Sequence, residues 1–130
     1  MAELEIRLHP QAAAEAETSR AWYFERNATV AAAFLAELNA AMLAVRESPT
    51  RWPLVHGNFR RFVLHKFPFS VVYAVRDGFI EVIAIAHHRR KPGYWSKRRS
   101  SRPLTNRWSA RVDDKVPSPI RRSRGAPLNR

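Results

Sequence analysis

Residues 87–98 concentrate the side chains of this sequence that could act on a phosphate or bind an acidic partner. These twelve residues hold two histidines, five Lys and Arg residues and the pair Tyr94-Trp95. A guanidinium group can bind a phosphate bidentately, and an unperturbed imidazole exchanges protons at about pH 6.5. A core strand does not carry so many cations, and a solvated charge run does not usually carry a Tyr-Trp pair. We therefore expect this segment to present a phosphate-facing or protein-facing surface at the end of a buried element.

A second basic group, Arg60-Arg61, lies in a strand-like run that is expected to neighbour residues 87–98. Because adjacent residues of a strand point to opposite faces, only one of these arginines is expected to reach a shared site. The other would then pair with the acidic helices. His87 continues an apolar run in register with Ile83 and Ile85, so it is either a hydrogen-bonded histidine at the edge of the core or a catalytic one.

Metal and cofactor chemistry has little support in the sequence. The chain has no cysteine, so it can form neither a disulfide nor a thiolate metal site. The histidines are not grouped with carboxylates at ligand spacing, and no Gly-rich phosphate loop is present. We expect no metal and no cofactor.

The charge of the chain is strongly asymmetric. The formal net charge of +12 over 130 residues divides into about −3 for residues 1–50, +6 for residues 51–96 and +9 for residues 97–130. Such a basic second half indicates a polyanion or an acidic protein as partner. The N-terminal residues lack the basic and apolar regions of a signal peptide, and we expect a cytoplasmic protein without a membrane segment.

The scaffold for these side chains is predicted to begin with a strand and two helices. Residues 3–8 alternate between charged and apolar, which is typical of a half-buried strand. The Ala- and Glu-rich residues 11–26 predict a helix, which Asn27 is expected to stop. Thr29 is expected to cap a second helix over residues 30–47, where apolar residues recur at helical spacing. So short a break predicts an antiparallel helical hairpin.

The second half predicts three strands after a Pro-containing loop, residues 48–58. The strand-like runs are residues 59–67, 69–76 and 79–87, with Asp77-Gly78 as a hairpin turn. The last run is apolar on both faces and is predicted to be the central strand. Helices grouped beside an antiparallel meander predict an α+β fold, with the first strand next to one edge of the meander and the hairpin on one face.

Two regions follow from this reading. Residues 1–98 are expected to form the folded domain. Residues 99–130 are rich in Pro, Arg and Ser and lack a periodic apolar pattern. They are expected to form a disordered basic tail.

The folded part resembles the toxins of the RelE/ParE superfamily of bacterial type II toxin–antitoxin modules. The resemblance covers about residues 4–98. It rests on motifs in a fixed order, namely His9-Pro10, Trp22-Tyr23, Phe34-Leu35, Pro49, Arg60-Arg61, Phe67-Pro68-Phe69, Tyr73, Ala86-His87, Arg89-Arg90 and Pro92-Gly93-Tyr94-Trp95. What it implies is a microbial RNase-like α+β domain neutralised by a cognate antitoxin. Some relatives are known only as plasmid stabilisation proteins.

The resemblance makes metal-independent mRNA cleavage our first expectation for function, because RelE-like members cut mRNA in the ribosomal A site. Such cleavage needs a base, cations that stabilise the anionic phosphorane, and an acid for the leaving oxygen. The resemblance points to these candidate catalytic residues: Arg60, Arg61, His87, Arg89, Arg90 and Tyr94.

One departure from the family pattern motivates the first of two alternatives. RelE-like nucleases carry a lysine cluster before or on the second sheet strand, whereas residues 49–58 offer only Arg51 and His56. ParE-like members poison DNA gyrase without chemistry of their own, which is the first alternative. The second alternative is an inactive relative that binds nucleic acid through the basic tail, residues 99–130. The implied partners are an acidic or amphipathic antitoxin segment and, as target, the ribosome with its mRNA or DNA gyrase.

Overall fold

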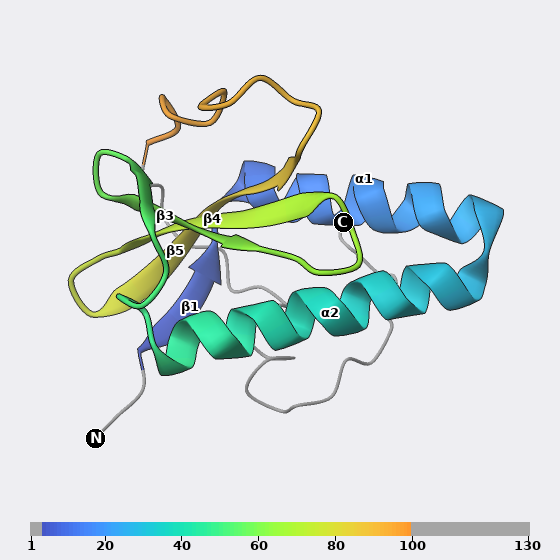
Figure 1. The fold of residues 1–130 in the computed structure, drawn as a ribbon, viewed down its shortest axis with the longest axis horizontal. Coiled ribbons are helices and arrows are strands. Elements are labelled where there is room, and N and C mark those ends of the chain that lie inside the picture. Colours follow the sequence, from blue (N-terminus) through green and yellow to red (C-terminus); the bar gives the residue numbers. More distant parts are fainter. Residues whose placement is uncertain (1–3, 100–130) are drawn as a thin grey trace.

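The computed structural model describes residues 4–99, which form one mixed sheet and two helices (Figure 1). The elements in chain order are β1 (Glu5–Leu8), α1 (Pro10–Arg26), α2 (Ala28–Glu47), β2 (Leu54–His56), β3 (Phe59–Val63), β4 (Phe69–Val75) and β5 (Phe79–His87). The predicted α+β fold is confirmed, with its N-terminal strand, helical hairpin and antiparallel meander. Apart from Arg99, the predicted tail lies outside the described residues.

The sheet has the strand order β1-β5-β4-β3-β2, so the predicted meander gains a short extra strand. β1 pairs in parallel with β5, and the remaining neighbours are antiparallel. This places β1 next to an edge of the meander, as predicted. The prediction that residues 79–87 form the central strand was wrong, because β2 extends the opposite edge and leaves β4 in the middle.

Asn27 separates the two helices and caps the second one. Its Oδ1 accepts hydrogen bonds from the backbone N–H groups of Thr29 (2.8 Å) and Val30 (3.3 Å). The predicted cap, Thr29, is therefore already inside α2, which begins at Ala28. The backbone of Asn27 is extended, so the chain reverses within one residue and α2 runs back antiparallel to α1 (Figure 1).

The main core lies between the helical hairpin and one face of the sheet. α2 contributes the fully buried side chains Phe34, Leu38 and Met42, which pack with Tyr73 of β4 and Ile80 of β5. By length and composition α2 could also cross a bilayer. Its apolar face is occupied by the core, and a core helix of a soluble protein passes the same test.

A β-bulge in β5 changes which residues share a face. Val72 pairs with Ala84 and its neighbour Tyr73 pairs with Val82, so Ile83 is the extra residue. Ile83 belongs to a second, smaller cluster on the helix-free face, whereas Ile85 belongs to the main core. The expected register of His87 with Ile83 was therefore wrong, because the bulge moves Ile83 to the other face.

Candidate functional site

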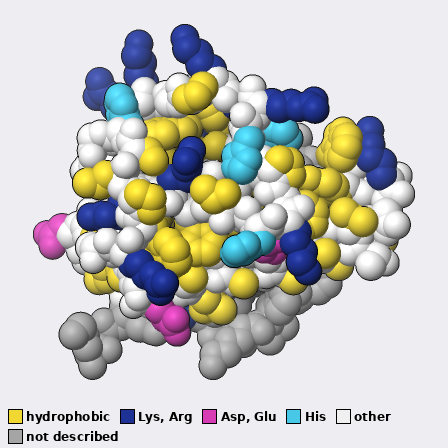
Figure 2. All heavy atoms as spheres, viewed as in Figure 1, with side chains coloured by type: hydrophobic (Ala, Val, Ile, Leu, Met, Phe, Trp, Pro, Cys, Tyr) yellow, Lys and Arg dark blue, Asp and Glu magenta, His cyan; other side chains and the backbone are white. Residues whose placement is uncertain are grey.

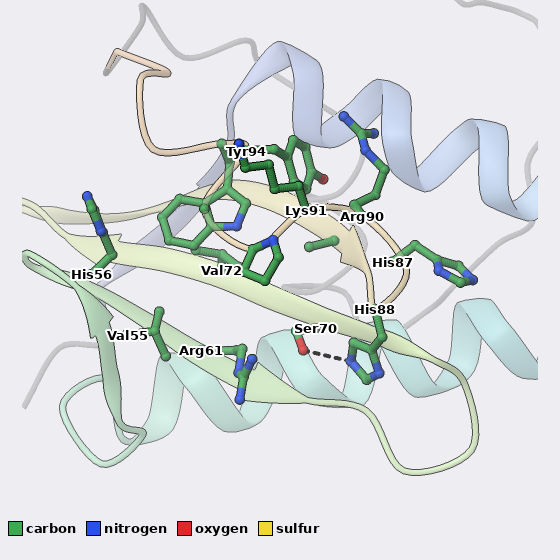
Figure 3. Close-up of a pocket in the computed structure, with 14 residues that line it drawn as sticks. Val55, His56, Arg61, Ser70, Val72, His87, His88, Arg90, Lys91 and Tyr94 are labelled. Carbon is green, nitrogen blue, oxygen red and sulfur yellow. Dashed lines mark hydrogen bonds between the residues drawn. The ribbon is translucent and has the colours of Figure 1, made fainter.

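A groove of about 430 Å³ opens on the helix-free face of the sheet (Figure 3). It lies between β2, β3, β4, the end of β5 and the segment that follows β5. Its lining residues are Val55, His56, Arg61, Ser70, Val72, Ala86, His87, His88, Arg90, Lys91, Pro92, Gly93, Tyr94 and Trp95. None of them is acidic. Figure 2 shows cationic and His side chains interspersed with apolar ones on this side of the molecule.

The adjacent arginines of β3 serve opposite faces of the sheet. Arg61 lines the groove, and its guanidinium has no hydrogen-bond or ion-pair partner within residues 4–99. Arg60 is on the helix side, where its Nη1 donates to the carbonyl oxygens of Thr50 (3.0 Å) and Trp52 (2.7 Å). Arg61 is therefore available to a ligand, whereas Arg60 fastens the loop after α2.

Ser70 and His88 form a pair inside the groove. The Ser70 hydroxyl and Nε2 of His88 lie 2.9 Å apart (Figure 3). Ser70 is buried and His88 is exposed, so the buried hydroxyl fixes one ring nitrogen and leaves Nδ1 for a ligand. Ser70 was not among the predicted site residues. The only signal in the sequence is a serine in an otherwise aliphatic and aromatic strand.

His87 lies at the rim of the groove, and its ring is turned away from Arg61 (Figure 3). The ring packs edge-on against Phe69 at 4.8 Å between centroids. Nδ1 of His87 accepts a hydrogen bond from the backbone N–H of Arg89 (3.0 Å). Burial lowers the pKa of His87, and the neighbouring Arg89 and His88 lower it further. The neutral ring therefore acts as an acceptor that shapes the turn after β5.

The predicted Arg89-Arg90 pair is also divided. Arg89 is exposed and does not line the groove. Arg90 does line it, with its guanidinium stacked over the Tyr94 ring at 3.8 Å from the centroid. Nη1 of Arg90 also lies 3.9 Å from the carboxylate of Glu15.

Tyr94 contributes its ring to the groove, while its hydroxyl is held elsewhere. The hydroxyl donates a hydrogen bond of 2.7 Å to Oε2 of Glu15 on α1. Burial raises the pKa of Tyr94 strongly, and Glu15 adds to the increase. The phenol therefore keeps its proton and donates it in a hydrogen bond to a carboxylate rather than toward a ligand. Sequence reasoning missed Glu15, because it is one of three glutamates in α1 and nothing in the sequence indicates its contacts.

Trp95 anchors the segment that forms one wall of the groove. Its side chain is 5% exposed and packs against Val72 and Ile83. Its ring lies 5.2 Å from that of Phe59 in an edge-on arrangement. Trp95 therefore covers part of the helix-free face of the sheet.

The groove thus joins Arg61, His88 and Arg90 but excludes Arg60, Arg89 and the ring of His87. Guanidinium and imidazole groups around an acid-free hollow can bind an anion. Within residues 4–99 no group of three or more His, Cys, Asp or Glu side chains could hold a metal ion.

Comparison with known proteins agrees with this architecture. A family model described as the ParE toxin of the type II toxin–antitoxin system parDE matches residues 6–92. A solved structure, the chromosomal ParDE toxin–antitoxin system from P. aeruginosa, superposes with a TM-score of 0.58 at 16% identity, covering 65% of this chain and 95% of that chain. No curated protein gives a significant match. The chain belongs to the ParE family of type II toxins, whose partner is a cognate antitoxin.

Proposed function

We propose that this toxin arrests growth by poisoning DNA gyrase through binding, without a bond-breaking step of its own. The observation that carries the proposal is the hydrogen bond from the Tyr94 hydroxyl to Glu15. Cleavage of mRNA without a metal needs an acid and a base within reach of the phosphodiester. In the free toxin the phenol that the resemblance offered for this task is committed to the scaffold. Membership of the ParE family supports the same choice.

The composition of the groove agrees with a binding role. Arg61, Arg90 and Lys91 supply positive charge, while no carboxylate among the lining residues could act as a base. The loop between α2 and β2 lacks the lysines of the RelE-like nucleases. A cationic, partly apolar hollow without an acid–base pair of carboxylates suits recognition of a surface better than turnover.

Cleavage of mRNA is the second candidate, and the Ser70–His88 pair favours it. Ser70 holds Nε2 of His88 at 2.9 Å, which leaves Nδ1 for a ligand in the groove that Arg61 also lines. An imidazole with a fixed orientation can transfer protons near neutral pH, and Arg61 could stabilise the phosphorane. His88 would then replace Tyr94 and the missing lysines as the group that moves protons.

Two assays on the same purified toxin separate the candidates. In the first, gyrase and supercoiled plasmid are incubated with toxin, and the trapped cleavage complexes are quantified. In the second, translating ribosomes are incubated with toxin and the mRNA ends are mapped. We expect trapped gyrase complexes and intact mRNA. Cut mRNA with unaffected gyrase would instead support the second candidate. Either target acts in the cytoplasm, which we propose as the site of action.

A further inference from the structure

Glu15 of α1 is the meeting point of three separate parts of the chain. Oε1 accepts the backbone N–H of Ile85 (3.0 Å) and Nη1 of Arg98 (3.1 Å). Oε2 accepts the Tyr94 hydroxyl (2.7 Å) and Nη2 of Arg98 (2.8 Å). The side chains of Arg98 and Glu15 are only 11% and 16% exposed, so these are well-shielded, charge-assisted bonds.

The side chains of Glu15 and Arg98 bind the backbone of β5 beyond the point where β1 ends. β1 pairs with β5 only as far as Val82. Beyond this point Glu15 accepts the N–H of Ile85, and Nη1 of Arg98 donates to the carbonyl oxygen of Ile83 (2.9 Å). Two side chains thus satisfy backbone groups that β1 would otherwise have paired. Since unpaired backbone groups are costly to bury, this edge depends on both side chains.

The same contacts fasten the segment 88–98 to the domain. Short-range turns hold the segment internally, through N–H bonds from Tyr94 to Lys91, from Ser96 to Gly93 and from Arg98 to Trp95. Glu15 ties this turn structure to α1 through Tyr94 and Arg98. Between these two anchors lies buried Trp95, and before them lie Arg90 and Lys91 on the wall of the groove.

We infer that Glu15 is a positioning residue for the toxin, because it sets the place of the segment 88–98 and hence the shape and charge of the groove. This inference deepens the proposed function, since it takes the groove to be the target-facing surface. Glu15 itself does not line the groove, so its effect on the target passes through Tyr94, Arg98 and the segment that they fix.

The test compares Glu15→Gln with the wild-type protein and two control variants. Gln keeps the size of the side chain and an acceptor for Ile85 but loses the charge that holds Arg98. Glu17→Gln, on the same helix, breaks only the exposed ion pair with Arg20 and should change nothing. Ile80→Val shortens a core side chain that lies outside the segment 88–98. We expect it to lower Tm about as much as Glu15→Gln does, while the Glu15 contacts stay intact.

Two readouts are taken from each variant. Amide hydrogen exchange is followed by mass spectrometry over residues 94–98 and, as an internal reference, over β4. Growth arrest is measured in cells at equal toxin level. For Glu15→Gln we expect exchange in residues 94–98 to rise about tenfold, as the loss of one charge-assisted bond would give, with β4 unchanged. We expect growth arrest to be lost in Glu15→Gln and kept in Ile80→Val at matched Tm.

The inference is overturned by either of two results: unchanged exchange in residues 94–98, or faster exchange with full growth arrest. If Glu15→Gln does not fold, Arg98→Met carries the same expectations, because it removes the other half of the contact and also lies outside the groove. The growth-arrest assay can be carried out without knowing the target of the toxin. A wild-type toxin that arrests growth without affecting gyrase would therefore refute the proposed function while leaving the role of Glu15 open to this test.

Discussion

The hydroxyl of Tyr94 lies 2.7 Å from the carboxylate of Glu15, although 79 residues separate the two in the chain. This contact divides the tyrosine between two tasks. Its ring supports Arg90 at the wall of the groove, and its hydroxyl ties that wall to α1. A residue that the resemblance made a catalytic candidate is, in the free toxin, part of the scaffold.

The tyrosines provide a spectroscopic prediction. Burial raises the pKa of Tyr23, raises that of Tyr73 to about 12 and raises that of Tyr94 further. In an absorbance titration of the native protein, we expect clearly less phenolate at about pH 10 than three unperturbed tyrosines would give. Glu15→Gln should lower the midpoint of Tyr94, since the carboxylate is one cause of its raised pKa. A full step near pH 10 while the circular dichroism remains native would contradict the contact.

The adjacent arginines of β3 provide a matched pair of variants. Arg60→Met leaves the carbonyl groups of Thr50 and Trp52 without their donor, so we expect it to lower the free energy of unfolding by about 1–3 kcal/mol. Arg61→Met removes an exposed side chain and should change stability by less than about 0.5 kcal/mol. It should nevertheless weaken growth arrest. Urea denaturation measures stability, and growth assays measure arrest. A loss of stability in Arg61→Met together with weaker arrest in Arg60→Met would contradict the placement of these arginines on opposite faces of the sheet.

His87 makes stability depend on pH. Because its pKa is lowered in the folded state, the unfolded chain binds a proton first as the pH falls below about 6.5. Stability should therefore decrease between the unfolded and the folded pKa of this group, and be fully present above both. His87→Gln should flatten this part of the curve. Denaturation midpoints measured from pH 8 to pH 5 test this, and an unchanged slope in the variant would assign the dependence to other groups.

The sequence was a good guide to the larger elements. Alternation predicted β1, an Ala- and Glu-rich composition predicted α1, helical periodicity predicted α2, and Asp77-Gly78 marked the β4–β5 turn. These are local signals, each contained in a short stretch of sequence. Asn27 was correctly placed at the break between the helices, but its role as the cap of α2 depends on which side chain reaches the free N–H groups, and two candidates lay within three residues.

The site was less predictable, because its geometry depends on contacts between distant residues. The bulge at Ile83 changes which residues of β5 face the helices, and no residue type in the sequence indicates a bulge there. β2 is three residues long and too short to show alternation. Alternation did predict that Arg60 and Arg61 would separate, although not which of them would face the groove. Glu15 and Ser70 gained their roles only when the fold brought Tyr94 and His88 to them.

The most direct test of the proposed function is the amount of cleaved DNA that gyrase retains in the presence of purified toxin. Supercoiled plasmid and gyrase are incubated with increasing toxin, trapped complexes are released with detergent and protease, and linear DNA is quantified. We predict a dose-dependent rise that the cognate antitoxin prevents and that Arg61→Met reduces. Unchanged supercoiling and no linear DNA, at toxin concentrations that arrest growth, would contradict the proposal.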